Sequence, residues 1–474
     1  MEQLYEQRNK IIAAFIIAAF IGLFNETALN MAFVQLGIDF GKETSTIQWL
    51  TTGYLLTLGI LVPVSAFLMQ RFTTRQLFTA SLLFSIAGTV ISGIAPIFSI
   101  LFIGRIVQAI GAAIIIPLMM NVILLVYPIH KRGAAMGKIG LVIVFAPAVG
   151  PTIAGVILDN LSWHWIFWVA LPFFFISLFV GLKFIQNVNE VQKVKFDIVS
   201  FIFSTIGFGG VVYGFSVSGE LGTFATTEVL SSISAGSLAL IIFVIRQLKL
   251  KQPMLNLRVF KYPMYILGLI IVLVGMMTIL STMVILPIYL QKALLLAPVF
   301  AGLILLPGGV INAFMSVVAG NLFDKFGPKQ MLPGGLILVI SSLFVLRGIN
   351  SSTSPYLIIA LHIILFVGIS LVMMPAQTNG LNELPRKLYA DGTAIMNTLM
   401  QVTGAIGTAI AVTIMSISTT NYNGDTVNGL VEGVQNSITF GLIIATIAFV
   451  LSFFTKNVRD SKPVEIEEPI KNIH

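Results

Sequence analysis

The ten residues GNLFDKFGPK at positions 320–329 decide the fold, because they form a short basic loop between two long apolar stretches. A related loop, AFLMQRFTTR, occupies positions 66–75, which lie 254 residues earlier (320 minus 66). Each loop joins two stretches long enough to cross a bilayer as helices. Two halves related in this way are typical of transporters, in which each half moves as a body around a central site.

The composition excludes a water-soluble globule. Of the 474 residues, 57% are hydrophobic and only 10% are charged, and the mean hydropathy is +0.98, whereas soluble domains carry about 25% charged residues. The absence of cysteine excludes disulfides, thiolate metal sites and a cysteine nucleophile. The net charge of +8 comes from basic residues scattered over short loops, so we expect no nucleic-acid partner. We also expect no metal site.

Fourteen windows of about 20 apolar residues predict an all-α integral membrane protein with fourteen transmembrane helices. The predicted spans of the first half are 11–33, 46–69, 76–97, 99–126, 134–157, 164–185 and 199–217. Those of the second half are 227–245, 264–290, 298–322, 331–346, 356–379, 393–418 and 438–454. The first span is too long for the apolar part of a signal peptide and has no clear cleavage site, so we expect it to be retained.

The distribution of lysine and arginine predicts the orientation, because positively charged loops resist translocation. With the N-terminus inside, 23 of the 27 basic residues fall in inner segments, three fall outside, and Arg105 lies within a span. Tryptophans 49, 163 and 165 fall at outer helix ends, where amphipathic rings are favoured. We expect a multi-pass protein of the plasma membrane with both termini in the cytoplasm.

Several motifs carry a resemblance to a known family. The loop at 320–329 resembles the signature G-x-L-x-D-[RK]-x-G-x-[RK] of the major facilitator superfamily, and the earlier copy matches it in part. Residues 105–113 resemble that family's fourth-helix motif, and APAVGPTIAG at 146–155 resembles the fifth-helix motif that marks antiporters. Residues 24–30, FNETALN, resemble the first-helix motif of the fourteen-span drug:proton antiporters, the branch with quaternary-ammonium and lincomycin-resistance exporters. The family usually carries Asp where this chain has Asn25, and the acid follows as Glu26.

The resemblance implies a major facilitator fold with a 6+2+6 arrangement of helices. We expect a six-helix bundle in residues 1–195, two inserted helices and a cytoplasmic loop in 196–262, a second six-helix bundle in 263–456, and a cytoplasmic tail in 457–474. The resemblance also implies gating roles for residues of the signature loops and the antiporter motif. They are Gln70, Arg71, Arg75, Pro147, Gly150, Pro151, Gly155, Gly320, Asp324, Lys325, Gly327 and Lys329. For Asp324, a latch across the cytoplasmic gate and a plain topology signal remain alternatives.

Three ionisable residues are candidates for proton coupling. Glu26 is the only acid deep inside a predicted span and Arg105 is the only deep base, and both are predicted about 10 Å below the outer surface. An acid in the membrane is costly, so its presence indicates a function or a partner. Glu26 exchanging a proton for substrate and a fixed ion pair between Glu26 and Arg105 are the alternatives. His362 is a second titrating candidate, or a neutral side chain hydrogen-bonded in the packing.

Polar uncharged residues within the spans predict a water-filled substrate cavity, although hydrogen bonding between helices would also explain each of them. The candidates are Asn30, Tyr54, Gln108, Asn121, Asn312, Gln377, Asn379, Asn397 and Gln401. We predict a proton-coupled antiporter that exports lipophilic or cationic small molecules by alternating access. We expect a monomer in the lipid bilayer that uses protons as the coupling ion and no other cofactor. An exporter of an endogenous metabolite or lipid on the same fold is the alternative, whereas the short, plain loops argue against an enzyme.

Overall fold

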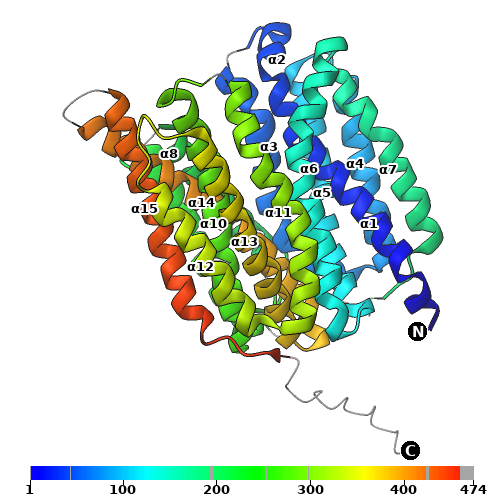
Figure 1. Ribbon diagram of the computed structural model, residues 1–474. Helices are drawn as coiled ribbons and strands as arrows, with labels where there is room; N and C mark the ends of the chain where they lie inside the picture. The colour runs from blue at the N-terminus through cyan, green and yellow to red at the C-terminus, as the bar shows by residue number, and fades with distance from the viewer. Residues whose placement is uncertain are drawn as a thin grey trace, which may run out of the picture.

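The computed structural model describes residues 2–42, 44–188, 191, 197–221, 223–250, 253–296, 298–422 and 426–458. These residues form fifteen α-helices and four short 3-10 helices, and they contain no β-strand (Figure 1). The first half contains α1 (Glu2–Ala28), α2 (Phe33–Phe40), α3 (Thr44–Arg71), α4 (Thr74–Gly93), α5 (Phe98–Val126), α6 (Arg132–Asn160) and α7 (His164–Phe184). The inserted pair is α8 (Ile198–Leu221) and α9 (Thr227–Lys249). The second half contains α10 (Pro263–Lys292), α11 (Pro298–Phe326), α12 (Pro328–Leu346), α13 (Pro355–Glu383), α14 (Tyr389–Asn421) and α15 (Thr426–Ser452).

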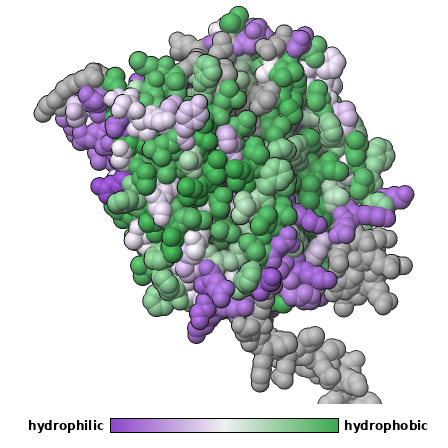
Figure 2. Space-filling view, in the orientation of Figure 1, coloured by the Kyte–Doolittle hydropathy of each residue, from purple (hydrophilic) through white to green (hydrophobic). Residues whose placement is uncertain are grey.

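The helices are built to cross a membrane. Thirteen of the described helices are long and apolar enough to do so by length and composition, and α6, with 29 residues, is the fourteenth long helix. Hydrophobic side chains cover the middle of the face seen in Figure 2, and hydrophilic ones gather toward the two ends. Large apolar residues such as Phe179, Phe314 and Phe344 are exposed on the outside of the bundle, as a lipid environment permits. The prediction of an all-α membrane protein with fourteen long helices is confirmed.

The long helices of the two halves form two groups that lie side by side (Figure 1). In the first group, α1 packs on α5, α6 and α7, and α4 packs on α5 and α7; in the second, α10 packs on α13, α14 and α15. The two groups meet where α6 packs along α11 and where α14 packs on α3 and α5. These two contacts between groups frame the candidate site.

The N-terminus and the last described residue, Val458, lie at the same end of the bundle, which we call the basal end (Figure 1). The two repeated loops also lie there, since each follows a helix that runs toward this end. The first loop begins α4 with a capping box between Thr73 and Gln76, which satisfies two backbone donors of the first turn. The second uses Gly327 at φ +73°, a left-handed conformation that favours glycine, before Pro328 starts α12.

Two predicted spans differ most from the structure, at the ends opposite the basal end. The last span was predicted to begin at Ile438, but α15 begins at Thr426, twelve residues earlier. The reason is amphipathicity: Asn428, Glu432 and Asn436 are exposed on α15 and lower its mean hydropathy, although the helix continues. The first predicted span is divided, because α1 ends at Ala28 and a 3-10 turn, Leu29–Ala32, leads into the short helix α2.

Candidate functional site

A small cavity of about 40 Å³ lies between the two groups of helices. Its wall is formed mainly by α1, α3 and α5, and α14 of the second group closes the other side. Four predicted site residues line this cavity: Glu26, Tyr54, Asn397 and Gln401. Most of the other lining residues are apolar and come from α1, α3 and α5. The cavity therefore combines an apolar lining with a few polar groups: a carboxylate, a phenol and two amides. Small-molecule sites commonly have this composition.

Glu26 is partly exposed, and it lines the cavity from α1. Among the described residues its carboxylate makes no hydrogen bond and no ion pair within 4.0 Å. Its neighbour Asn25 is only 2% exposed, and both polar atoms of the Asn25 side chain lack a hydrogen-bond partner. Consecutive residues on a helix point about 100° apart, and here the acid faces the cavity while the amide faces the protein.

Arg105 is completely buried on α5 and is held by neutral groups. It donates from Nη1 to the Asn25 carbonyl oxygen (3.1 Å) and to Gln108 Oε1 (3.0 Å), and its Cζ lies 4.3 Å from the ring centroid of Tyr54. Within the described chain, none of its nitrogens lies within 4.0 Å of a Glu26 oxygen. Arg105 therefore lies near the Glu26 cavity without forming an ion pair with Glu26, and the Tyr54 ring lies beside its guanidinium.

A methionine from the first group contacts two of the predicted amides. Asn397 donates from Nδ2 to the Met120 sulfur at 3.0 Å, and Gln377 Nε2 lies 3.9 Å from the same sulfur. Gln377 also lies 3.8 Å from the sulfur of Met400. Met120 is on α5 whereas the amides are on α13 and α14, so these contacts join the two groups of helices next to the cavity. Sulfur is polarisable and methionine is flexible, so this junction can adapt in shape.

The other predicted amides hold helices together away from the cavity. Gln108 donates to Thr89 on α4, and Asn312 accepts a hydrogen bond from Ser370 on α13. Asn379 binds the backbone of the C-terminal segment at Lys456 and Val458. Asn121 is buried on α5 and does not line the cavity. The side chain of Asn30 lies outside the described part of the structure.

His362 lies within the second group, between α13 and α11. It is 4% exposed, its ring meets Phe366 edge-on at 4.6 Å, and its Nδ1 atom packs against Gly308 without a hydrogen-bond partner. It does not line the Glu26 cavity.

At the basal end, α6 and α11 approach each other through glycines. A Cβ atom added to Gly133 would lie 2.5 Å from the carbonyl oxygen of Gly320, and one added to Gly137 would lie 2.6 Å from that of Ser316. This contact brings the Asp324 carboxylate to the start of α6, where it accepts hydrogen bonds from the backbone N–H groups of Gly133 (3.0 Å) and Ala134 (2.7 Å). We call this arrangement the Asp324 latch; it places an acid at the positive end of a helix dipole.

A second contact between the groups involves the first copy of the loop. Gln70, at the end of α3, donates from Nε2 to both carboxylate oxygens of Asp391 in the first turn of α14, at 3.3 and 3.5 Å. Asp391 is 1% exposed and also accepts the backbone N–H of Asn256 at 2.8 Å. We call this arrangement the Gln70 latch. Both latches lie at the basal end and join one group of helices to the other.

The remaining motif residues have structural surroundings of their own. Arg75 donates to the Leu182 carbonyl oxygen at the end of α7, while the side chains of Arg71, Lys325 and Lys329 are exposed. In α6, the Pro147 carbonyl accepts a weak hydrogen bond from Thr27. A Cβ on Gly150 would meet α1, whereas one on Gly155 would have no atom within 4 Å. The side chain of Pro151 lies outside the described residues.

Two charged residues of the basal end, Asp391 and Arg132, were not among the predicted site residues. Asp391 was overlooked because it lies near a helix end, where acids usually face water. Arg132 was counted among loop residues, yet it is 8% exposed and donates from α6 to Asn382 and to Tyr389, both at 3.0 Å. No short motif in the sequence marks these contacts, since the paired residues are about 250 positions apart or more.

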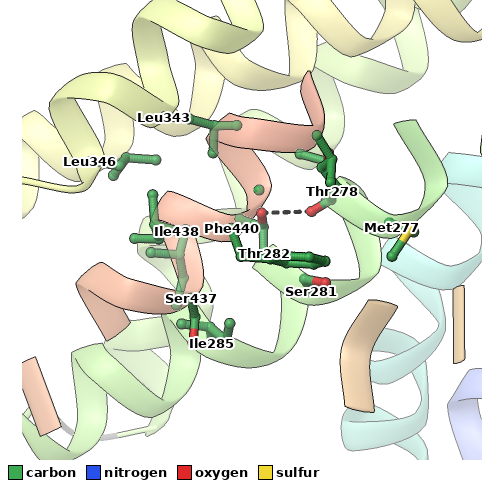
Figure 3. A pocket seen from close by; sticks show the side chains of 13 residues that line it. Met277, Thr278, Ser281, Thr282, Ile285, Leu343, Leu346, Ser437, Ile438 and Phe440 are labelled. Carbon is green, nitrogen blue, oxygen red and sulfur yellow. Dashed lines mark hydrogen bonds between the residues drawn. The ribbon is translucent and has the colours of Figure 1, made fainter. Parts of the chain in front are cut away.

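A second small cavity, of about 20 Å³, lies inside the second group between α10, α12 and α15 (Figure 3). Its hydroxyl groups are largely satisfied within their own surroundings: Thr282 donates to the Thr278 carbonyl oxygen, and Ser437 donates to that of Ala411. None of its lining residues is charged. It offers an apolar gap between helices and no group that would carry a proton.

The bundle of long helices, the repeated basal loops and the central cavity are the architecture of a multi-pass membrane transporter. A model of the Major Facilitator Superfamily matches residues 15–408, and the chain belongs to this family. It is 57% identical over 458 residues to the lincomycin resistance protein LmrB of Listeria monocytogenes, covering 95% of this chain and 97% of that one. It is 53% identical to the Bacillus subtilis protein of the same name, covering 95% and 96%. The predicted family resemblance and fold are confirmed.

Solved structures support the same fold at low sequence identity. The human organic anion transporter MFSD10 superposes with a TM-score of 0.66 at 11% identity, covering 94% of this chain and 99% of that one. The proton:xylose symporter XylE superposes with a TM-score of 0.62 at 13% identity, covering 92% and 94%. These likenesses concern the fold alone.

Proposed function

We propose that this protein is a proton-coupled antiporter that exports lipophilic or cationic small molecules, including drugs of the lincomycin type. Relatives more than 50% identical are named lincomycin resistance proteins, and this supports the class of substrate. The main support for proton coupling is the position of Glu26. Its carboxylate has no hydrogen bond among the described residues, and it lines a cavity between the two groups of helices. Such a group can release its proton as a substrate enters the same space.

The mechanism we propose is a rocking motion of the two groups about this cavity, with the basal end in the cytoplasm. The excess of basic residues in the loops predicted to be inner supports this orientation. In the arrangement described, both latches and the α6–α11 contact hold the basal end together. Opening to the cytoplasm then requires these contacts to separate, and resealing them would open the other side.

Proton exchange at Glu26 supplies the driving force in this proposal. Moving one elementary charge through 100 mV releases about 2.3 kcal/mol. This free energy can maintain a nearly fiftyfold ratio of substrate concentrations across the membrane. A neutral substrate exchanged for one proton would use that voltage, whereas a monovalent cation exchanged one for one would be driven by the pH gradient alone. Arg105 would act on Glu26 through space and help to set when the proton leaves.

The test uses the purified protein in proteoliposomes with an imposed pH gradient. We expect Glu26→Gln to reduce gradient-driven transport of lincomycin or ethidium at least about tenfold, while exchange of substrate without a gradient persists. Glu432→Gln, which removes an exposed acid from α15, is the matched control. Equal gradient-driven transport by wild type and Glu26→Gln would remove Glu26 from the mechanism.

A second candidate keeps the fold and makes the natural cargo an endogenous metabolite or lipid. One relative, 25% identical over 408 residues, is named riboflavin transporter RibZ of Clostridioides difficile and favours this possibility. Comparing the metabolites retained by cells with and without the gene separates the two. A single accumulating metabolite, together with no drug movement in proteoliposomes, would favour the second candidate.

A further inference from the structure

The inserted helix α8 lies across the junction between the two groups of long helices. Its residues Phe208 and Val212 belong to a buried cluster with Val402 of α14, and Leu56 of α3 packs against the same cluster. Helix α8 therefore contacts the first group through α3 and the second through α14. A helix in this position must adjust whenever α3 and α14 separate.

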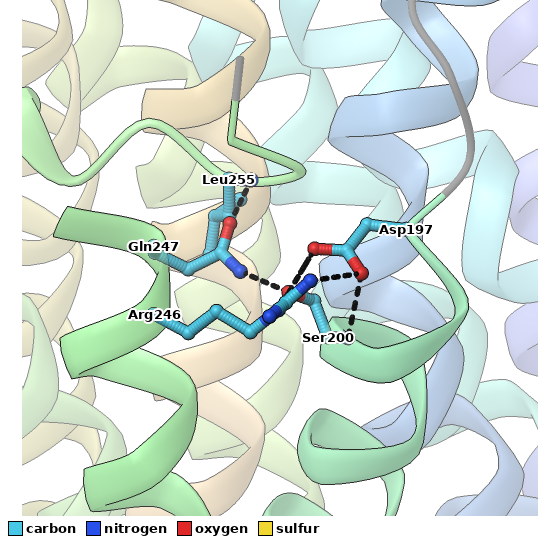
Figure 4. Close-up of polar contacts among 5 residues, drawn as sticks. All are labelled: Asp197, Ser200, Arg246, Gln247 and Leu255. Atoms are coloured by element: carbon cyan, nitrogen blue, oxygen red, sulfur yellow. Dashed lines mark hydrogen bonds and ion pairs between the residues drawn. The ribbon is translucent and has the colours of Figure 1, made fainter. Parts of the chain in front are cut away.

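A polar network fixes the basal ends of α8 and α9 to each other (Figure 4). Arg246 of α9 forms a two-pronged contact with Asp197, from Nη2 to Oδ1 at 2.9 Å and from Nε to Oδ2 at 3.1 Å. Asp197 also receives the hydroxyl of Ser200 at 2.6 Å and its backbone N–H at 3.2 Å. Gln247, which is 2% exposed, donates to the Ser200 hydroxyl at 2.6 Å.

This network reaches the Gln70 latch through the segment that follows α9. Gln247 Oε1 accepts the backbone N–H of Leu255 at 3.1 Å (Figure 4), and Leu255 itself is 3% exposed. The next residue, Asn256, donates its backbone N–H to Asp391 Oδ1 at 2.8 Å. Asp391 in turn accepts the Gln70 amide from the other group of helices. Hydrogen bonds on the consecutive residues Leu255 and Asn256 therefore connect the inserted pair to the basal latch.

We propose that the inserted pair α8–α9 is a working part of the basal gate, and that Arg246 and Gln247 are positioning residues that hold the Asn256 N–H on Asp391. This inference rests on the proposed rocking mechanism and adds a role for the two extra helices. The pair sets the proportion of molecules in which the gate is closed. With Asn256 in place, Asp391 is held for its bond with Gln70, and without it the carboxylate loses one of its hydrogen-bond donors.

The direction of the effect follows from the chemistry of Asp391. It is almost completely buried, and the described chain places no lysine or arginine within 4.0 Å of it. A buried carboxylate that loses a donor is left with less compensation for its desolvation. Opening the basal end returns it to water, so a weaker network around Asn256 favours the open gate.

The experiment measures the gate directly. The chain has no cysteine, so Lys131→Cys and Gln330→Cys, two exposed positions on opposite groups at the basal end, can carry spin labels. Double electron–electron resonance in nanodiscs then gives the proportions of short and long distances. We expect Arg246→Gln to raise the ratio of open to closed gate about threefold, and Arg246→Lys to restore most of the wild-type ratio.

Lys249→Gln is the matched control, because it removes the same charge from the exposed surface of α9 three residues away. It should leave the distance distribution unchanged. Gln247→Leu tests the connection without altering charge, and it should open the gate as Arg246→Gln does. If the wild type shows two distances and neither Arg246→Gln nor Gln247→Leu changes their proportions, this inference is wrong while the rocking mechanism stands. If only one distance is found at every pH tested, with and without added substrate, the rocking mechanism itself fails.

Discussion

The two basal latches occupy equivalent positions in the two halves of the chain, yet they use opposite chemistry. In the Asp324 latch, an acid at the end of α11 accepts two backbone N–H groups at the start of α6. In the Gln70 latch, the equivalent position on α3 carries an amide that donates, and the acid is Asp391, in the first turn of α14. In both, one carboxylate lies at the positive end of a helix that begins at the basal end.

The difference lies in which partner brings the charge. The Asp324 carboxylate comes from the opposite group, so its attraction to the helix end acts between the groups. The Asp391 carboxylate belongs to the helix whose dipole it complements, and only hydrogen bonds from Gln70, at 3.3 and 3.5 Å, cross between the groups. We therefore expect the Asp324 latch to be the stronger of the two and the Gln70 latch to be the one that other elements can adjust.

The largest effect is expected from Gly133→Ala, which tests the glycine contact beneath the Asp324 latch. The added methyl group would lie 2.5 Å from the Gly320 oxygen and 2.6 Å from Asp324 Oδ1, so α6 and α11 must separate. Overpacking costs about 1–3 kcal/mol, and lost hydrogen bonds to a charged group cost about as much. We expect the closed fraction in the spin-label experiment to fall about a hundredfold. Gly155→Ala, which meets no atom within 4 Å, should behave as wild type.

Asp324→Asn tests the charge of the same latch with little change in shape. An amide retains one acceptor oxygen, but its NH₂ group cannot accept the second backbone N–H. We expect the ratio of open to closed gate to rise about tenfold, equivalent to about 1.4 kcal/mol. A ratio equal to that of Gln70→Ala would mean that the two latches do not differ in strength.

Gln70→Ala removes the only side chain that links α3 to Asp391 among the described hydrogen bonds. Because these bonds are long, we expect a smaller rise in the same ratio, about fourfold. Moving the acid from position 391 to position 70 tests whether the Gln70 latch works with the acid on the other group of helices. Gln70→Glu alone should open the gate further by placing two acids together, whereas Gln70→Glu with Asp391→Asn should recover much of the loss. Failure of the double variant to recover would show that the position of the acid, and not its presence, matters.

Much of this architecture could be predicted from the sequence, because membrane-spanning helices and basic loops are recognised from residues that are neighbours along the chain. The repeat that pairs position 70 with position 324 was visible as a fixed offset of 254 residues. Glu26 could be selected because an acid inside an apolar span is rare and costly. The cavity that it lines could not be derived, since the cavity depends on how α14 meets α1, α3 and α5.

The basal contacts show why the pairing of residues between the two groups of helices could not be predicted from the sequence. Asp391 and Arg132 are near helix ends, where local pattern predicts exposure, and only the packing of the two groups buries them. The predicted amides divide for the same reason: Asn397 and Gln401 line the cavity, while Asn312 and Gln108 bond neighbouring helices. Helical periodicity gives the direction of a side chain only relative to its own helix. Which neighbour it meets depends on tertiary packing.

The smallest expected effect concerns the pH dependence of the network that supports the Gln70 latch. Burial acts to raise the pKa of the Asp197 carboxyl, but hydrogen bonds from Arg246 and Ser200 outweigh it and hold that pKa below its usual value. A carboxyl with a lowered pKa contributes its full stabilisation above the ordinary Asp pKa of about 3.9 and loses it only as the pH falls through the lowered value. Asp197→Asn should therefore open the gate about twofold, to the same extent at pH 7.5 and at pH 5.5. If the difference between Asp197→Asn and wild type disappears at pH 5.5, Asp197 is protonated in that range, and the inserted pair would loosen the gate in response to acid.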